Sequence, residues 1–385
     1  MQFYELSAYG NMIGDRIRTG AYCQALARAV KPGDVVVDLG AGAGIFTLHA
    51  CRLGARLVHA IEPNNTIQIA REIVHANGFS QRVTFHQAMS FQVELPEPCD
   101  VLITDLNGVL PLFERAIPTI IDARRRLLKP RGALIPQRDT LWAALVETSD
   151  IYHKNYDNAW QSANDGFDMK AARERAINIP IKQYFELNQL LGGPVQWRRL
   201  DFRVIERASV SGLVQIEVKR QGTAHGFALW FDSELIDDIR FSNCPGQPRL
   251  IYGQMFFPFP EPLPVLPNQT IMVDLRADLV AGDYIWQWTT QKTSALSPDK
   301  IERRYHQSSL FSNAFGPEQL RKMSDQHIPL LNEEGFIHMR ALELMNTRRS
   351  LGEIAETMAV EFPKRFATSN DALGFIGDLS TRWST

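Results

Sequence analysis

The fold of the chain is decided by the stretch Val35-Val36-Val37-Asp38-Leu39-Gly40-Ala41-Gly42-Ala43-Gly44-Ile45-Phe46. Three consecutive β-branched residues predict a short buried strand, and the glycines that follow predict a tight turn. Residues 45–53 can then continue as a helix. Such a turn aims a helix N-terminus at a ligand and lets the backbone approach it closely. The stretch therefore predicts a ligand site at the end of this strand.

Two acidic residues near the turn indicate which ligand binds. Asp38 precedes the first glycine by two residues, where a carboxylate would repel a pyrophosphate but suits a cation. Glu62 follows a second predicted strand at 57–61, where an acid can bind ribose hydroxyls. S-adenosyl-L-methionine carries an ammonium, a sulfonium and a ribose, so we expect it to bind here, against Gly40 and Gly42. A dinucleotide site and a purely structural turn are the alternatives.

Composition narrows the function classes. The 385 residues are 45% hydrophobic and 22% charged, as expected for a globular protein of two or three domains. A net charge of −2 gives the protein no overall positive potential that would attract nucleic acid, so no nucleic-acid partner is expected. The four cysteines are scattered without a C-x-x-C pair, so we expect no metal site. No apolar stretch of about 18 residues occurs, so we expect a cytoplasmic protein without a membrane span.

Strand and helix patterns alternate through the first part of the chain. An amphipathic helix is predicted over residues 9–30, before the first strand. The predicted strands are 35–39, 57–61, 83–87, 100–104 and 133–135, and the predicted helices between them lie near 45–53, 65–77 and 111–128. This alternation predicts a doubly wound parallel sheet.

The pattern changes in the rest of the chain. Residues 201–291 contain short alternating segments punctuated by Gly, Pro, Asn and Asp, which predicts an antiparallel sandwich or barrel. From Ser297 the pattern indicates helices. Ser350 followed by Glu353 predicts a capping box at the start of one of them.

Several motifs, in order, carry a family resemblance. They are Met12-Ile13-Gly14-Asp15-Arg16-Ile17-Arg18-Thr19-Gly20-Ala21-Tyr22, the glycine turn with Glu62, Ile103-Thr104-Asp105-Leu106-Asn107-Gly108, Leu134-Ile135-Pro136-Gln137-Arg138-Asp139, Gly166-Phe167-Asp168-Met169 and Leu229-Trp230-Phe231-Asp232. Together, residues 9–290 resemble the protein arginine methyltransferase family.

The resemblance implies an α/β fold. A Rossmann-like class I methyltransferase domain would occupy residues 1–140, and an antiparallel β-barrel substrate domain residues 141–296. The latter would carry a dimerisation arm at about 150–192, which implies a homodimer. Aromatic residues cluster in the arm and would form the interface: Tyr152, Tyr156, Trp160 and Phe167.

The resemblance also assigns roles around the cofactor. Arg18 would contact the cofactor carboxylate, and Met12 would border the substrate channel. Met89 and Ser90, just past the third predicted strand, would border the adenine. An amphipathic helix with a solvated arginine and an ordinary loop are the alternatives.

Two acids, Asp105 and Glu114, match the pair of glutamates with which the family clamps a guanidinium. A planar cation needs two carboxylates for bidentate hydrogen bonds, which makes these residues the catalytic candidates. Asp105 is one methylene shorter than the family's glutamate. The family's Thr-His-Trp loop is also replaced, by residues 250–254, where Tyr252 and Gln254 would contact the substrate.

Residues 297–385 lie outside this resemblance. They look like the small winged-helix peptide-binding domain of pyrroloquinoline quinone biosynthesis, and a plain helical cap is the alternative. Overall we expect an S-adenosylmethionine-dependent methyltransferase that acts on a peptide or protein side chain. A methyltransferase of a small natural product and a cofactor-binding scaffold without turnover are the competing hypotheses.

Overall fold

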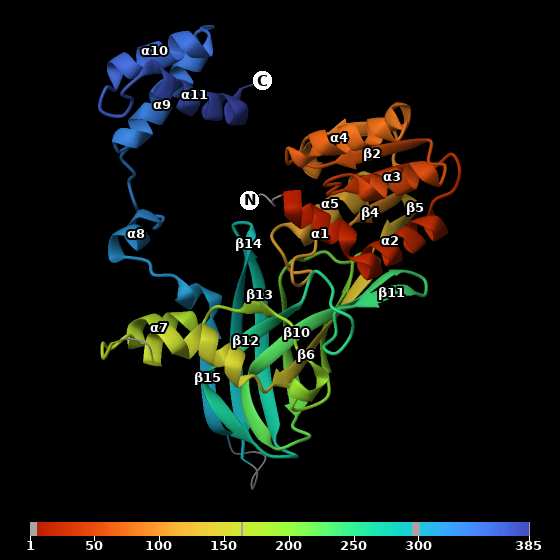
Figure 1. Cartoon of the computed structure of the whole chain (residues 1–385), viewed down its shortest axis with the longest axis vertical. Helices are drawn as coiled ribbons and strands as arrows, with labels where there is room; N and C mark the ends of the chain where they lie inside the picture. The colour runs from red at the N-terminus through yellow and green to blue at the C-terminus, as the bar shows by residue number, and fades with distance from the viewer. Residues whose placement is uncertain (1–5, 163–164, 295–300, 385) are drawn as a thin grey trace. The chain divides into compact units, whose positions relative to one another are not determined.

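The computed structural model describes residues 6–162, 165–294 and 301–384. The chain divides into two compact units, of which the first ends at Ala314 and the second begins at Phe315. The first unit contains a parallel sheet with its helices and an antiparallel part that adjoins it (Figure 1). The second unit is helical.

A five-stranded parallel sheet has the order β3-β2-β1-β4-β5. Its strands are β1 Val35–Leu39, β2 Leu57–Ile61, β3 Val83–His86, β4 Cys99–Thr104 and β5 Leu128–Ile135. Every residue of β1 is buried, as its apolar run predicted. The strand order reverses between β1 and β4, and ligands of such sheets bind at the carboxyl ends of the strands at this point. The predicted Rossmann-like domain is confirmed.

Helices accompany this sheet, with two differences from the sequence prediction. They are α1 Leu6–Gly14, α2 Arg16–Ala29, α3 Ile45–Arg52, α4 Thr66–Ala76 and α5 Ala116–Arg126, with short 3-10 turns η1 Ser80–Arg82 and η2 Ser90–Gln92. The helix predicted over 9–30 is two helices, because the Asp15 carboxylate accepts a hydrogen bond from the Arg18 backbone N–H (3.1 Å) and starts a new one. The helix predicted from 111 begins later, because a loop precedes it in which Glu114 has φ +39°.

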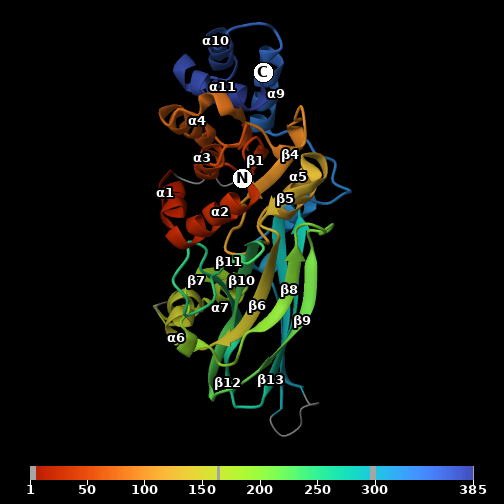
Figure 2. The same cartoon turned by 90° about the vertical axis from the view of Figure 1, so that its right-hand side faces the viewer.

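The antiparallel part is built from two sheets (Figure 2). One has the order β7-β12-β10-β6-β8, with β11 also paired to β10, and the other has the order β15-β14-β13-β9. The strands are β6 Arg138–Val146, β7 Ile181–Gln183, β8 Val195–Asp201, β9 Val210–Glu217, β10 Gly222–Ile236, β11 Ile239–Ser242, β12 Gln254–Val265, β13 Thr270–Val280, β14 Asp283–Thr293 and β15 Ile301–Ser308.

An aromatic core joins these two sheets. The rings of Phe227 and Phe257 stack with centroids 4.9 Å apart, and the Trp288 ring of the other sheet meets Phe257 edge-on at 5.2 Å. The predicted antiparallel domain is therefore confirmed. Among the described strands, however, the pairings leave two separate sheets and do not close a barrel, so its architecture is that of a sandwich.

Strand β15 corrects the prediction that the helical tail starts at 297. Residues 301–308 pair with β14 along the edge of the sheet. Most of them are polar or charged, so their sequence carries no clear apolar alternation. Residues 297–300 lie outside the described residues. The boundary between the first two domains, at 140, stays a prediction.

The expected dimerisation arm contains α6 Ser149–Tyr152, the π-helical segment η3 His153–Ser162, α7 Lys170–Ala176 and the short turn η4 Leu187–Gln189. Tyr152 and Tyr156 are buried against the sheet, and their hydroxyls donate to backbone oxygens of Phe259 (2.8 Å) and Ile179 (2.9 Å). The expectation that these two tyrosines form an exposed interface is therefore wrong. Phe167 is 71% exposed.

The second unit contains helices α8 Pro317–Lys322, α9 Glu333–Met345, α10 Leu351–Glu361 and α11 Ser369–Trp383, and the short turn η5 Ser309–Ser312 precedes it. Its small core is Ile337, Ala341, Leu344, Ile354, Ala355, Met358, Phe366, Ala372, Ile376 and Leu379. The predicted capping box is present, since Ser350 and Glu353 each accept a hydrogen bond from the other's backbone N–H. The helical character is confirmed, and the winged-helix resemblance stays a prediction. In the part of the chain that the structure describes, none of the helices has the length and apolarity needed to cross a membrane.

Candidate active site

The glycine turn after β1 forms one wall of the candidate site. Gly40 and Gly42 have φ +78° and +51°, a backbone conformation that side chains rarely adopt. A Cβ atom at Gly40 would lie 2.5 Å from Leu106 Cδ2. The backbone N–H of Gly40 donates to the Ile61 carbonyl of the next strand (2.9 Å). The turn is thus held close to β2 and presents bare backbone.

Glu62 follows β2 and faces the same space. It is 5% exposed, and its carboxylate accepts hydrogen bonds from the backbone N–H groups of Gly42 (3.1 Å) and Asn64 (2.9 Å). Burial raises the pKa of Glu62 above its usual value, while the two N–H groups oppose this rise. The predicted ribose-binding acid is therefore fixed in place at the carboxyl end of β2.

A cavity of about 700 Å³ opens at the carboxyl ends of β1 and β4. Its lining brings together ten of the twelve site residues predicted from the sequence: Met12, Arg18, Gly40, Gly42, Glu62, Met89, Ser90, Asp105, Glu114 and Tyr252. The turn between β13 and β14 also reaches it, at Ala281 and Gly282. Residues from both sheet systems of the first unit therefore form one site.

Two predicted residues lie elsewhere. Asp38 is not part of the cavity lining, because its carboxylate accepts a hydrogen bond from the Thr47 hydroxyl of α3 (2.6 Å). Burial raises the pKa of Asp38 to about 6. Gln254 is buried in the sheet, where its amide oxygen accepts from Phe185 N–H (2.8 Å) and its nitrogen donates to the Asn243 carbonyl (2.5 Å). Both residues hold backbone segments that support the cavity.

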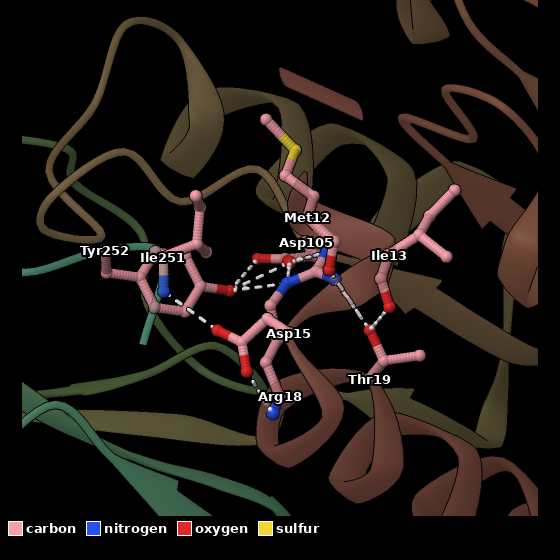
Figure 3. A network of polar contacts seen from close by, with 8 residues as sticks. All are labelled: Met12, Ile13, Asp15, Arg18, Thr19, Asp105, Ile251 and Tyr252. Atoms are coloured by element: carbon pink, nitrogen blue, oxygen red, sulfur yellow. Dashed lines mark hydrogen bonds and ion pairs between the residues drawn. The ribbon is translucent and has the colours of Figure 1, made fainter. Parts of the chain in front are cut away.

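A buried ion pair occupies the centre of the site (Figure 3). Arg18 and Asp105 side chains are each 6% exposed, and both Nε and Nη2 of Arg18 contact Oδ2 of Asp105. The Tyr252 hydroxyl donates to the Asp105 carboxylate (2.8 Å) and lies 3.0 Å from Arg18 Nε. Burial is the largest single influence and disfavours the charged guanidinium, but Asp105, Tyr252 and Tyr22 together outweigh it and raise the pKa of Arg18. Arg18 was expected at the cofactor carboxylate alone, and its link to Asp105 is new.

The replaced loop at 250–254 supports this ion pair in two ways. The backbone N–H of Ile251 donates to Asp15 Oδ2 (2.8 Å), so the loop is tied to the start of α2 (Figure 3). Tyr252 is buried, and burial together with the Asp105 carboxylate raises the pKa of its hydroxyl well above the usual value. Tyr252 therefore stays protonated and acts as a hydrogen-bond donor.

Glu114 offers the other carboxylate of the expected clamp. It lies in the loop before α5 and lines the cavity. Within the described residues, its side chain has no hydrogen-bond or ion-pair partner. Unlike Asp105, Glu114 is thus available to a cationic ligand without displacing a protein partner.

Sequence reasoning missed three residues near the cavity. Tyr9 lies against the turn, since a Cβ atom at Gly42 would be 2.7 Å from its ring. Asn107, which lies between the two acids in the sequence, lines the cavity with them, and Asp139 is fully buried near Asp105 and Asn107. Tyr9 sits on the predicted amphipathic helix together with Met12, which is a usable signal. Asn107 and Asp139 each belong to one of the motifs that carry the family resemblance, but the pairing of Asp139 with Ser233 depends on strand register and cannot be derived from the sequence.

Asp139 makes the stability of the fold pH-dependent. Burial raises its pKa to about 7, against 3.8 for an exposed aspartate. The folded state therefore holds a proton that the unfolded chain releases, and this contribution is present below pH 4 and lost as pH rises to about 7. Asp139→Asn should gain stability relative to wild type over this window, by roughly 2–4 kcal/mol.

Urea unfolding of both proteins at pH 4, 6 and 8 measures this difference. Thr140→Val, at the next position of β6, carries no ionisable group and should differ from wild type by the same amount at every pH. A stability difference between Asp139→Asn and wild type that stays constant from pH 4 to 8 would contradict the raised pKa.

Two family models match the first unit. The model described as ribosomal protein L11 methyltransferase (PrmA) matches residues 13–164. The model described as the arginine methyltransferase oligomerization subdomain matches residues 137–289. The two matches overlap at residues 137–164, and this overlap begins where the parallel sheet ends and the antiparallel sheets begin.

Curated proteins that are similar in sequence to this chain are also named as arginine methyltransferases. The chain is 32% identical over 241 residues to a probable protein arginine N-methyltransferase 6 of Arabidopsis thaliana, covering 60% of this chain and 55% of that protein. It is 30% identical over 286 residues to the histone-arginine methyltransferase CARMER of Drosophila yakuba, covering 70% and 54%. The chain thus spans about half the length of the curated relatives it matches.

Solved structures share the fold. The Trypanosoma brucei PRMT1 enzyme-prozyme complex with AdoHcy aligns with a TM-score of 0.72 and 21% identity, over 79% of this chain and 98% of that chain. Protein arginine methyltransferase 10 of Arabidopsis thaliana aligns with a TM-score of 0.70 and 22% identity, with the same coverage. By sequence and by fold, the resemblance of this chain to the protein arginine methyltransferase family is confirmed.

Proposed function

We propose that the protein is an S-adenosylmethionine-dependent methyltransferase that acts on arginine side chains of a peptide or protein. The observation that carries this proposal is that two acids, Asp105 and the unpartnered Glu114, line the same cavity as the glycine turn. The curated relatives named as arginine methyltransferases support it.

The cavity lining fits the cofactor. Gly40 and Gly42 leave room for close backbone approach, and Glu62 is placed to accept ribose hydroxyls. Ser90 has a buried hydroxyl with no hydrogen-bond partner among the described residues and lines the cavity, as an adenine contact requires. Nη1 of Arg18 donates to the Met12 carbonyl (3.0 Å) and the Thr19 hydroxyl (3.3 Å), and Nε and Nη2 contact Asp105. One N–H group of Nη2 is therefore left for the cofactor carboxylate. When bound, the cofactor supplies an electrophilic methyl group.

The two acids would divide the work on the acceptor. Asp105 is held by Arg18 and Tyr252, so its position is fixed and its negative charge is partly neutralised. It would orient the guanidinium by one edge. Glu114 has no such partner and would bind the other edge, concentrate electron density on the attacking nitrogen and accept its proton. Orientation of this kind contributes much of the rate in methyl transfer, which needs an in-line approach.

A different acceptor is the second candidate. Asp105 is shorter than the family's glutamate and is already bonded to Arg18. Asp105 and Glu114 together therefore offer a guanidinium fewer free hydrogen-bond acceptors than two unpaired glutamates would. This favours a small natural product or another side chain as the alternative methyl acceptor. The cavity and cofactor site would be the same.

We also propose that two copies of the chain form a dimer through the arm at residues 150–192. Phe167 is 71% exposed in this segment, and the family model that spans it is described as an oligomerization subdomain. A large exposed aromatic residue is typical of the centre of an interface.

Methyl transfer to an arginine peptide tests the proposed reaction. We expect wild type to transfer isotope-labelled methyl groups from S-adenosylmethionine to arginine peptides but not to matched lysine peptides. Glu114→Gln keeps the shape but removes the charge, so turnover should fall about 10²-fold or more, with cofactor affinity nearly unchanged. Glu72→Gln, on the exposed face of α4, is the control that should retain full activity. Equal turnover in Glu114→Gln and wild type would refute the role of Glu114, and labelling of only small molecules would favour the alternative.

Replacement of Phe167 tests the dimer. Sedimentation of wild type at micromolar concentration should give twice the monomer mass, and Phe167→Asp should shift the population toward monomer, because a buried charge opposes association. Arg175→Gln, a polar change on α7 of the same arm, should leave the mass unchanged. A wild-type protein that sediments as a monomer would overturn the proposal.

A further inference from the structure

A buried polar cluster lies beside the loop that follows β4, close enough to Asp105 for the Asp105 charge to act on it. It consists of Asp139 on β6, Ser233 on β10 and Asn107 in that loop. Asp139 and Ser233 are opposite each other in the β6–β10 pairing, so their side chains share one face of the sheet. The Ser233 hydroxyl and the Asn107 amide are the hydrogen-bonding groups that face the Asp139 carboxyl.

The polar atoms of this cluster are buried, and their hydrogen-bonding capacity is not fully used. Asp139 and Ser233 are 0% exposed. Within the described residues, both carboxyl oxygens of Asp139, the Ser233 hydroxyl and the Asn107 amide nitrogen are buried without a partner in good hydrogen-bonding geometry. Leaving such groups unpaired is costly, so neighbouring groups that can pair by small side-chain rotations are expected to do so. The Asp139 carboxyl keeps an acceptor oxygen whether or not it is protonated.

Asn107 connects this cluster to the cavity. It is half-buried and lines the cavity together with Asp105 and Glu114, while its amide nitrogen is buried and its amide faces the Asp139 carboxyl. The nitrogen and oxygen of an amide diverge from one carbon atom. Anchoring the nitrogen to Asp139 therefore turns the oxygen away from the interior and toward the cavity.

A guanidinium bound in the cavity would need this oxygen as a hydrogen-bond acceptor. It carries several N–H donors in one plane. Asp105 Oδ2 already accepts from Arg18, and the Tyr252 hydroxyl contacts both oxygens of Asp105 (Figure 3). Asp105 thus keeps little free acceptor capacity, and Glu114 alone cannot satisfy the remaining donors.

We propose that Asp139, with Ser233, holds the Asn107 amide so that its oxygen is a third acceptor for the guanidinium of the substrate arginine. Asn107 contacts the substrate, and Asp139 is a positioning residue that acts through Asn107. This inference rests on the proposed function, which it deepens by assigning the contact that offsets the short and occupied Asp105.

A double-mutant cycle tests the proposal with steady-state kinetics on an arginine peptide. Asn107→Ala and Asp139→Leu should each raise the peptide KM about tenfold, the effect of one lost hydrogen bond to a charged group, with kcat changed little and cofactor KM unchanged. Asp139→Asn keeps an acceptor oxygen and should restore the wild-type peptide KM. In the Asn107→Ala background, Asp139→Leu should have no further effect, because the residue through which it acts is gone.

The outcomes separate the inference from the proposed function. If Asp139→Leu fails to fold, Ser233→Ala takes its place in the same cycle with the same expected non-additivity. Additive effects, a change confined to cofactor KM, or an Asp139→Asn variant as impaired as Asp139→Leu would each overturn the inference while leaving the methyltransferase activity standing. A wild-type protein that methylates no arginine peptide would overturn the proposed function and the inference with it.

Discussion

The ion pair between Arg18 and Asp105 is the interaction on which the rest of the site depends. Both side chains are almost fully buried, and the Tyr252 hydroxyl bonds to the same carboxylate. Burying two charges is costly, and the cost is offset only where each charge keeps its partners. Loss of either partner would leave an uncompensated buried charge, an effect of about 3–5 kcal/mol. The pair therefore restricts where α2 and the end of β4 can lie.

The same interaction joins the two sheet systems of the first unit. Arg18 belongs to the helical layer of the parallel sheet, Asp105 to the end of its strand β4, and Tyr252 to a loop of the antiparallel part. The contact of Ile251 N–H with Asp15 adds a second link at the same place. The cavity exists because these segments meet above the reversal point of the parallel sheet. The position of Asp105 is therefore a consequence of the fold, whereas Glu114 lies in a loop and remains free to bind.

Most of the parallel sheet could be predicted from the sequence, because its strands are short apolar runs bounded by glycine and charged turns. Ten site residues could be placed through the sequence motifs and through the family resemblance that these motifs carry. Asp38 could not, because the sequence does not reveal that Thr47, across the turn, is its hydrogen-bond partner. The link from Arg18 to Asp105 spans 87 positions and depends on the folded helix layer. Asp139 faces Ser233 only through strand register, and β15 is an edge strand with too little apolar alternation to be recognised.

The most direct test of this account is a crystal structure of the protein with S-adenosylhomocysteine and an arginine peptide. The account predicts that the cofactor product lies along the glycine turn with its ribose at Glu62, and that the peptide guanidinium lies between Asp105 and Glu114. Arg18 and Tyr252 should keep their contacts with Asp105 in this complex. A guanidinium bound away from Glu114, or an Asp105 side chain turned away from Arg18 to receive the substrate, would contradict the account.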